Sequence, residues 1–275
     1  MNRIESLFNE VRDKGKTALM PFIMAGDPNI EVSLDLILEI EKGGADVIEV
    51  GVPFSDPMAD GPTIQAAGQR ALSSGTSLKH VLEMVKRVRS KSEVPLVLMS
   101  YYNLFYQYGL KRFAFDSAAA GADGVIIPDL PPEEAGPWCR NAKDAGIYPV
   151  FLIAPTTPPD RIKKADRLSR GFLYYVSITG VTGARKTLPE GLVRSLDETR
   201  SNIHNPLAVG FGISNKDQVR ALSSHVDGII VGSALVKIIE RHQTTSRLLE
   251  ETGGFIRELK AGIDNNQLNK KPPHK

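Results

Sequence analysis

Two carboxylates near residue 50 are the strongest candidates for chemistry in this chain of 275 residues. Glu49 lies in the apolar run DVIEVG at 46–51, and Asp60 lies in the sequence that follows it. Burial in an apolar strand disfavours a charged carboxylate and raises its pKa toward the range useful for acid–base catalysis at neutral pH. The alternative is a structural glutamate paired with a polar neighbour, but acids are almost never fully buried without a specific reason. We therefore interpret Glu49 as a catalytic acid or base.

The sequence after Glu49, PFSDPMADGPTIQ, carries a second acid besides Asp60. Asp56 in Ser-Asp-Pro is typical of a turn, whereas Asp60 in Ala-Asp-Gly-Pro precedes a helix and could cap it or face a pocket. Spacing alone does not separate these alternatives, so the role of each aspartate stays open at this point.

Three glycine-containing segments late in the chain are candidates for binding a phosphate. They are TGVTGARK at 179–186, GFGIS at 210–214 and GSAL at 232–235. Each follows an apolar run, and a short helix is expected to begin at Ser233, so backbone N–H groups and a helix dipole are available to an anion. The alternative is three ordinary tight turns.

Eight short apolar runs, each followed by a stretch of helical periodicity, must position these residues. The runs occupy residues 18–24, 46–51, 95–99, 123–127, 148–153, 172–176, 206–209 and 227–231. The helical stretches include residues 30–43, 78–90, 111–120, 133–145, 159–168, 190–200, 215–222 and 246–261. This count predicts an α/β fold, a (β/α)8 TIM barrel with its chemistry at the carboxyl ends of the strands. A doubly wound open sheet is disfavoured because no Gly-x-Gly-x-x-Gly follows an early strand.

A single domain over residues 1–265 accounts for almost the whole chain, with extra short helices expected in the loops that follow the strands. An additional N-terminal helix is predicted because its apolar residues share one face. These residues are Ile4, Leu7, Phe8 and Val11. Residues 266–275 are polar and are expected to form a disordered tail.

A repeated small residue, aspartate and strand occurs in GGADVIEVG at 43–51, AGADGVIIPD at 120–129 and HVDGIIVGS at 225–233. The aspartates, Asp46, Asp123 and Asp227, stand at the entrances of strands, opposite the end where a barrel does its chemistry. We therefore predict that all three are structural and satisfy free backbone amides.

The mouth of such a barrel would be lined by side chains at the strand ends, most of them apolar. They are Phe22, Met99, Tyr101, Ile126, Leu152, Tyr174, Phe211 and Ile230. A lining of this kind suits a flat hydrophobic ring.

Composition excludes several other classes. The chain has 34 Lys plus Arg against 32 Asp plus Glu, which gives a net charge of +2 and no strong field for nucleic acid or anionic membrane. No apolar run is long enough for a membrane span, and the N-terminus lacks a signal sequence. The lone Cys139 suits a cytoplasmic location. Scattered histidines and strands free of lysine argue against a metal site and against a Schiff base.

The chain closely resembles the tryptophan synthase alpha subunit family, the indole-3-glycerol-phosphate lyases. The resemblance rests on PFIMAGDP at 21–28, IEVGVPFSDPMADGPTIQ at 48–65, IIPDLP at 126–131, GVTGAR at 180–185 and GFGIS at 210–214. It implies that Glu49 and Asp60 are the catalytic pair. It further implies phosphate contacts at Gly183, Gly212, Gly232 and Ser233, and an indole pocket that includes Phe22, Met99, Tyr101, Tyr174 and Phe211.

The implied reaction is the retro-aldol cleavage of indole-3-glycerol phosphate to indole and glyceraldehyde 3-phosphate, late in tryptophan biosynthesis. Indole can accept the electrons of the broken bond, so no cofactor is expected in this chain. The implied partner is a PLP-containing beta subunit in a heterotetramer of two alpha and two beta subunits. A lid is expected at 180–191, with Thr182 and Arg185 in it.

Three rivals stay open from the sequence. The first is a stand-alone lyase that releases free indole. The second is a catalytically idle barrel that only activates a beta partner. The third is another phosphate-binding barrel, such as a ribose-phosphate isomerase, which would use a different acid–base pair from Glu49 and Asp60.

Overall fold

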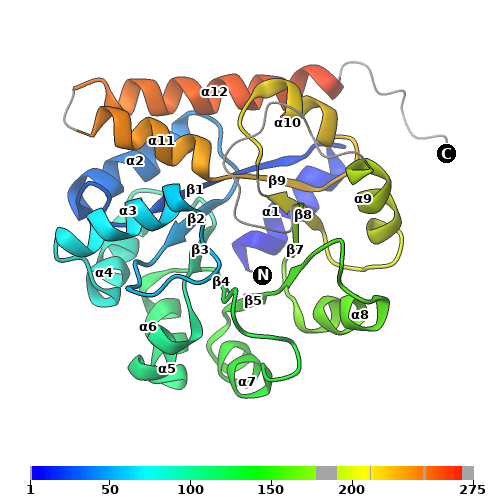
Figure 1. Cartoon of the computed structure of the whole chain (residues 1–275), viewed down its shortest axis with the longest axis horizontal. Helices are drawn as coiled ribbons and strands as arrows, with labels where there is room; N and C mark the ends of the chain where they lie inside the picture. The colour runs from blue at the N-terminus through cyan, green and yellow to red at the C-terminus, as the bar shows by residue number, and fades with distance from the viewer. Residues whose placement is uncertain (1, 178–190, 211, 244–245, 268–275) are drawn as a thin grey trace.

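The protein is a parallel β-barrel surrounded by helices, and its computed structural model describes residues 2–177, 191–210, 212–243 and 246–267 (Figure 1). The strands are β1 (Ala18–Met24), β2 (Ile48–Gly51), β3 (Leu96–Met99), β4 (Gly124–Ile126), β5 (Tyr148–Val150), β6 (Leu152–Ile153), β7 (Leu173–Val176), β8 (Leu207–Gly210) and β9 (Gly228–Val231). Their order in the sheet is β5-β4-β3-β2-β1-β9-β8-β7-β6, and every neighbouring pair is parallel. The predicted TIM barrel is confirmed.

One predicted strand, at 148–153, is interrupted at Phe151 and forms β5 and β6. The Phe151 N–H donates to the Ser169 hydroxyl at 3.1 Å instead of to a neighbouring strand. β5 pairs with β4 and β6 pairs with β7, so the chain changes partner at this point. Because β5 and β6 stand at the two ends of the strand order, the continuous chain through Phe151 closes the barrel.

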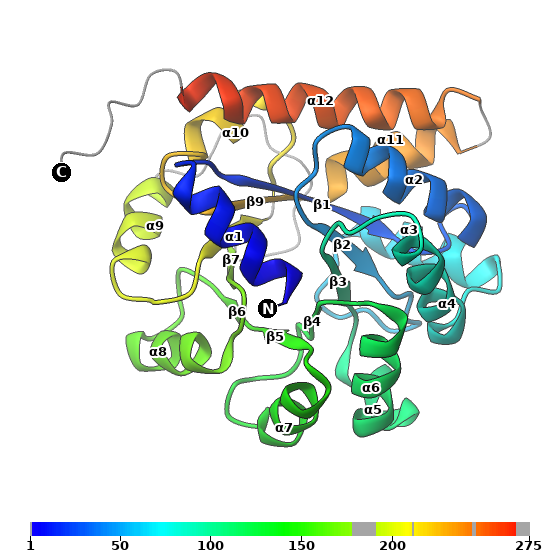
Figure 2. The same cartoon turned by 180° about the vertical axis from the view of Figure 1, so that it is seen from behind.

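The helices cover the outside of the barrel (Figures 1 and 2). They are α1 (Arg3–Asp13), α2 (Ile30–Lys42), α3 (Pro62–Ser73), α4 (Leu78–Arg89), α5 (Tyr102–Tyr108), α6 (Leu110–Ala120), α7 (Gly136–Ala145), α8 (Pro159–Leu168), α9 (Leu192–Arg200), α10 (Lys216–Leu222), α11 (Ser233–His242) and α12 (Leu248–Gln267). Short helices α3 and α5 occupy the loops after β2 and β3, as expected. α12 reaches two residues into the predicted tail, and residues 268–275 lie outside the described residues. No described helix is long and apolar enough to cross a membrane.

The N-terminal helix α1 packs across the amino-terminal opening of the barrel (Figure 2). Ile4, Phe8 and Val11 are buried and join the apolar cluster that fills the barrel interior. The Phe8 ring lies 5.7 Å from that of Phe172, measured between centroids. The predicted apolar face of this helix therefore closes one end of the barrel and leaves the other end free for a pocket.

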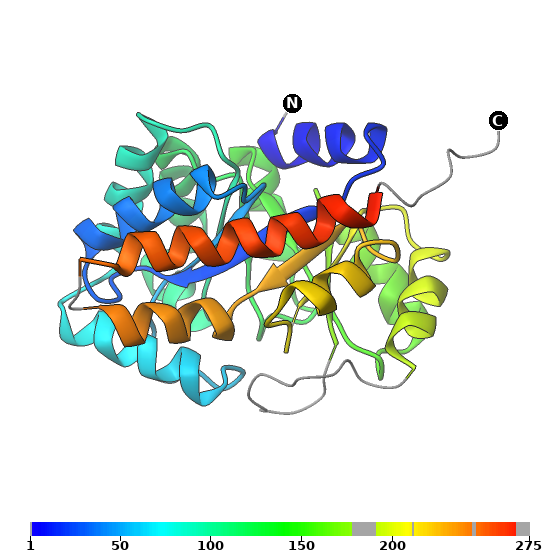
Figure 3. The same cartoon turned by 90° about the horizontal axis from the view of Figure 1, so that it is seen from above.

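The three repeated aspartates satisfy backbone amides at the strand entrances, as predicted. Carboxylate oxygens accept the N–H of a residue in a neighbouring strand: Leu19 to Asp46 at 2.7 Å, Leu96 to Asp123 at 2.9 Å and Leu207 to Asp227 at 2.9 Å. Each aspartate also meets a cation, namely Lys260 at Asp46, Arg3 and Arg89 at Asp123, and Arg200 at Asp227. The long helix α12, which crosses the surface in Figure 3, contributes the lysine.

Candidate active site

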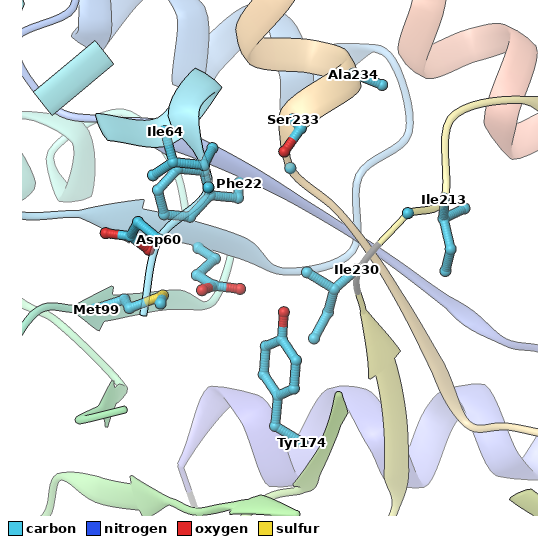
Figure 4. Close-up of a pocket in the computed structure, with 13 residues that line it drawn as sticks. Phe22, Asp60, Ile64, Met99, Tyr174, Ile213, Ile230, Ser233 and Ala234 are labelled. Carbon is cyan, nitrogen blue, oxygen red and sulfur yellow. The ribbon is translucent and has the colours of Figure 1, made fainter. Parts of the chain in front are cut away.

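A pocket of about 720 Å³, which includes space open to solvent, lies at the carboxyl ends of the strands. Its lining comes from β1, β2, β3, β7 and β9 and from the loops and helix starts beyond them (Figure 4). The lining residues are Phe22, Glu49, Asp60, Gly61, Ile64, Met99, Tyr174, Gly212, Ile213, Ile230, Gly232, Ser233 and Ala234. Glu49 and Asp60, 11 positions apart in the sequence, thus face one cavity.

Glu49 is buried in β2, between Phe22 of β1 and Val97 of β3 in the sheet register. Its side chain is inside the barrel mouth, with only 2% of the residue exposed, and its Oε2 atom has no hydrogen-bond partner among the described residues. Burial, followed by the charge of Asp60, raises the pKa of Glu49 to about 8. Glu49 is therefore mainly protonated at pH 7 and can donate a proton.

Asp60 lies at the end of the β2–α3 loop and lines the pocket (Figure 4). The N-cap of α3 is Gly61, so Asp60 does not cap that helix. Burial raises the pKa of Asp60, and a hydrogen bond from the Tyr101 hydroxyl opposes that rise. Asp56, by contrast, is exposed and hydrogen-bonded to its neighbour Ser55. The structure therefore places only Asp60 in the pocket.

Tyr101 supports the loop that carries Asp60. Its hydroxyl oxygen accepts the N–H of Ala59 at 3.0 Å, and its ring stacks on Phe54 with the centroids 5.5 Å apart. Tyr101 lines an adjoining cavity of about 330 Å³ that shares Phe22, Asp60, Ile64 and Met99 with the main pocket. It therefore lies beside the predicted indole pocket and fixes the loop from behind.

The apolar walls of the pocket depend on two glycines. A Cβ atom on Gly51 would lie 2.6 Å from Cζ of Phe22, and one on Gly210 would lie 2.3 Å from the Tyr174 hydroxyl. Both distances are shorter than real carbon contacts, so neither ring could keep its position beside a larger residue. Burial, with Glu49 and Asp60 nearby, raises the pKa of Tyr174 well above its usual range, so this hydroxyl stays neutral.

The opposite side of the pocket is made of backbone at Gly212 and at the start of α11. Gly212 has a φ of 78°, a conformation that favours glycine. Gly232 is the N-cap of α11 and has no side chain to cap the first turn. The Ser233 hydroxyl points toward the cavity in Figure 4. The positive end of the helix dipole and the amides of the first turn therefore face the pocket, as an anion requires.

Three predicted pocket residues, Tyr101, Ile126 and Leu152, do not line the main pocket, which corrects the sequence interpretation. Ile126 belongs to the apolar cluster that fills the barrel interior, and the partly buried Leu152 packs against that cluster. A barrel core is filled by several layers of inward side chains, and only the outermost layer reaches the mouth. Four further predicted residues, Phe211, Gly183, Thr182 and Arg185, lie outside the described residues.

Sequence reasoning missed four residues that line the pocket: Gly61, Ile64, Ile213 and Ala234. The signal for two of them was present, because Gly-Pro after Asp60 starts a helix that must turn its first side chains toward the site. Within the described part of the chain, no group of three or more His, Cys, Asp or Glu side chains could hold a metal ion.

Comparison with known proteins gives one consistent family. The family model described as tryptophan synthase alpha chain matches residues 8–264. The tryptophan synthase alpha chain of Citrifermentans bemidjiense is 48% identical over 263 residues, which cover 96% of this chain and 98% of that protein. The corresponding protein of Roseiflexus castenholzii is 50% identical over 261 residues, covering 94% and 100%.

Solved structures agree with these relatives. The tryptophan synthase alpha chain of Legionella pneumophila superposes with a TM-score of 0.89 at 37% identity, covering 96% of this chain and 98% of that one. A chain from the tryptophan synthase a2b2 complex of Pyrococcus furiosus gives a TM-score of 0.84 at 40% identity, covering 90% and 98%. The relatives and the solved structures therefore agree on one family over nearly the full length of this chain.

Proposed function

The chain belongs to the tryptophan synthase alpha chain family, a lyase family of tryptophan biosynthesis, and we propose that Glu49 and Asp60 carry out its reaction here. The reaction is the retro-aldol cleavage of indole-3-glycerol phosphate into indole and glyceraldehyde 3-phosphate. The observation that carries this assignment is the buried Glu49 carboxyl, which lines the pocket with Asp60 and has one oxygen without a hydrogen-bond partner among the described residues. Burial and the charge of Asp60 raise its pKa, which favours the protonated form.

Glu49 acts first as an acid and then as a base. Its protonated carboxyl gives a proton to C3 of the indole, which leaves the ring nitrogen positively charged. The carboxylate so formed takes the proton of the side-chain hydroxyl next to C3. The carbon–carbon bond breaks, its electrons return to the ring, and the hydroxyl carbon becomes the aldehyde. Glu49 ends in its starting protonation state, so one carboxyl serves both steps.

Asp60 stabilises the charge that develops during this cycle. Its carboxylate faces the same cavity as Glu49 and is positioned by Tyr101. A negative charge at that position favours the positive ring nitrogen formed when C3 is protonated. The flat indole fits between apolar side chains such as Phe22, Met99 and Ile230.

The phosphate binds at Gly212 and the start of α11, opposite the two acids. It does not react, so its binding energy is available to hold the reacting carbon against Glu49. Ser233 supplies a hydroxyl and, with Ala234, backbone N–H groups at the positive end of the helix. This side of the pocket needs no lysine.

We further propose that this chain contains no cofactor of its own and passes indole to a PLP-containing beta subunit. The Pyrococcus furiosus relative was solved as an a2b2 complex. Within the described lining of this pocket there is no lysine that could form a Schiff base with PLP. Met58, 80% exposed in the loop between β2 and α3, offers an apolar contact for a partner beside the active site.

The experiment that tests this function measures indole release from indole-3-glycerol phosphate, with and without a beta subunit. Glu49→Gln should lower kcat by about a hundredfold or more because Gln cannot exchange a proton. The control is Glu198→Gln, a surface acid 64% exposed on α9, which should keep normal turnover. Near-normal turnover of Glu49→Gln would contradict the assignment.

The two remaining rivals are separate outcomes of the same assay. Strong activation by the beta subunit supports the complex, whereas high turnover by the chain alone supports a stand-alone lyase. A wild-type chain that never cleaves the substrate, but still raises the activity of a beta subunit, is an idle barrel. That result would reject the proposed catalytic roles of Glu49 and Asp60.

A further inference from the structure

Arg70 joins three elements that each supply part of the pocket. It lies on α3, and its Nε and Nη2 atoms donate to the two carboxylate oxygens of Asp27, both at 2.8 Å. Its Nη1 atom donates to Glu240 of α11 at 2.9 Å. Asp27 follows β1 and is 1% exposed, whereas the Glu240 side chain is 48% exposed. One guanidinium therefore ties together β1, α3 and α11.

Each of these three elements contributes residues to the pocket proposed to bind the substrate. β1 carries Phe22 of the apolar wall, and α3 follows directly on Asp60 and carries Ile64. α11 begins at Ser233, on the side assigned to the phosphate. Arg70 itself does not line the pocket, so it touches no substrate and acts only on the positions of these elements.

Apolar side chains of the same three elements also pack against one another. Phe22 and Met24 of β1, Ala67 and Ala71 of α3 and Val236 of α11 form one buried apolar cluster. The end of α3 also approaches the turn after β1, where the Ser74 hydroxyl donates to the Gly26 carbonyl at 3.1 Å. The alanine side chains of α3 make only apolar, non-directional contacts with β1. The planar fork of Arg70 on Asp27 is a directional contact.

We propose that Arg70 is a positioning residue that fixes the separation between the phosphate side of the pocket and the two catalytic acids. This inference rests on the proposed function, because indole-3-glycerol phosphate spans both sides. Phosphate binding accelerates cleavage only if the reacting carbon is held at the right distance from Glu49. Loss of the Arg70 contacts would leave the phosphate side and the two acids intact, but would change the distance between them.

The test is Arg70→Lys, which keeps the charge but loses the fork. We expect kcat/KM for indole-3-glycerol phosphate to fall about tenfold or more, mostly through kcat. The dissociation constant of glycerol 3-phosphate, which occupies only the phosphate side, should change less than about twofold. The matched control is Arg87→Lys: Arg87 of α4 makes the same two-bond contact to Glu31 of α2, at 2.6 Å for each bond, away from the pocket. Its kinetics should equal those of wild type.

A second variant keeps the test decisive if Arg70→Lys does not fold. Glu240→Gln removes the negative charge at the exposed end of the network and leaves the Asp27 contact intact. It should lower kcat about two- to threefold, again with glycerol 3-phosphate binding unchanged. Unchanged kcat in every variant that folds, or equal loss of kcat and glycerol 3-phosphate affinity, would overturn the positioning role. A wild-type chain without cleavage activity would instead contradict the proposed function.

Discussion

Buried acids at the two ends of the barrel differ in their hydrogen-bond and ion-pair partners. At the amino end, Asp123 is 2% exposed and its carboxylate meets the N–H of Leu96 and the guanidinium groups of Arg3 and Arg89. At the carboxyl end, Glu49 is equally buried, but one of its oxygens has no partner among the described residues. A buried carboxyl group is therefore fully hydrogen-bonded at the amino end, whereas at the carboxyl end one carboxyl oxygen is available to a ligand.

This difference explains which acid can react. Burial raises the pKa of Asp123 too, but its amide and arginine partners oppose part of that rise. For Glu49 both burial and the neighbouring Asp60 raise the pKa, so nothing opposes the protonated form. A paired acid at a strand entrance stabilises the barrel, whereas an unpaired acid at a strand exit costs stability and keeps a transferable proton. Three measurements test this contrast.

The largest expected effect is at the amino end. Asp123→Asn should lower the free energy of unfolding by about 3 kcal/mol, because it leaves Arg89 half-buried without its anion. The measurement is urea unfolding at pH 7, together with kcat for the folded protein, which should stay near wild type. Glu93→Gln is the control: Glu93 contacts the same Arg3 but is 77% exposed, so its loss should cost under about 0.5 kcal/mol. If both substitutions lowered the free energy of unfolding equally, buried and exposed ion pairs would not differ in their contribution to stability.

An effect of similar size and opposite sign is expected at the carboxyl end. The folded pKa of Glu49, about 8, lies above its unfolded value of 4.5, so wild type loses stability as the pH rises between these values. Glu49→Gln does not titrate and should be more stable than wild type by about 3 kcal/mol at pH 7. Turnover of wild type should fall over the upper part of this range, because Glu49 loses the proton that cleavage needs.

Unfolding free energies of wild type and Glu49→Gln from pH 5 to pH 9 measure this titration. The difference should grow with pH and level off above about pH 8. The surface variant Glu198→Gln should show no such growth. A constant difference across the range would mean that Glu49 is ionised throughout, and the proton-donor role would fail.

The smallest effect concerns another acid at the amino end, Asp166 of α8. Burial raises its pKa, but hydrogen bonds from Asn205 and His204 outweigh that and leave the pKa below its usual value. Its stabilising effect is therefore present at neutral pH and lost as the pH falls through the folded pKa. Asp166→Asn should cost about 1 kcal/mol at pH 7, and thermal unfolding should show the difference shrinking below about pH 4. The exposed Asp217→Asn should cost nothing at either pH, and a pH-independent cost at Asp166 would exclude this titration.

Much of this molecule follows from local patterns. Continuous apolar runs predicted every barrel strand, because strands buried on both faces need no polar alternation. The Asp46, Asp123 and Asp227 repeat also predicted its role, since each aspartate stands just before the first residues of its strand. Where the prediction failed, a contact distant in sequence decided: the Ser169 hydroxyl takes the N–H of Phe151 and splits one strand into two.

The sequence by itself determined the barrel, the acid inside its second strand and the glycines near the phosphate, because periodicity, burial and turn preferences are local properties. Residue spacing did not separate Asp60 from Asp56, and the tertiary structure showed that Asp60 lines the pocket while Asp56 is exposed. It also showed that Ile126 and Leu152 lie below the pocket. It alone brought Arg70 to Asp27, 43 positions away, because those contacts depend on how helices and strands pack in three dimensions. Local sequence patterns thus identified the candidate acids, and tertiary packing determined that Glu49 and Asp60 share a cavity.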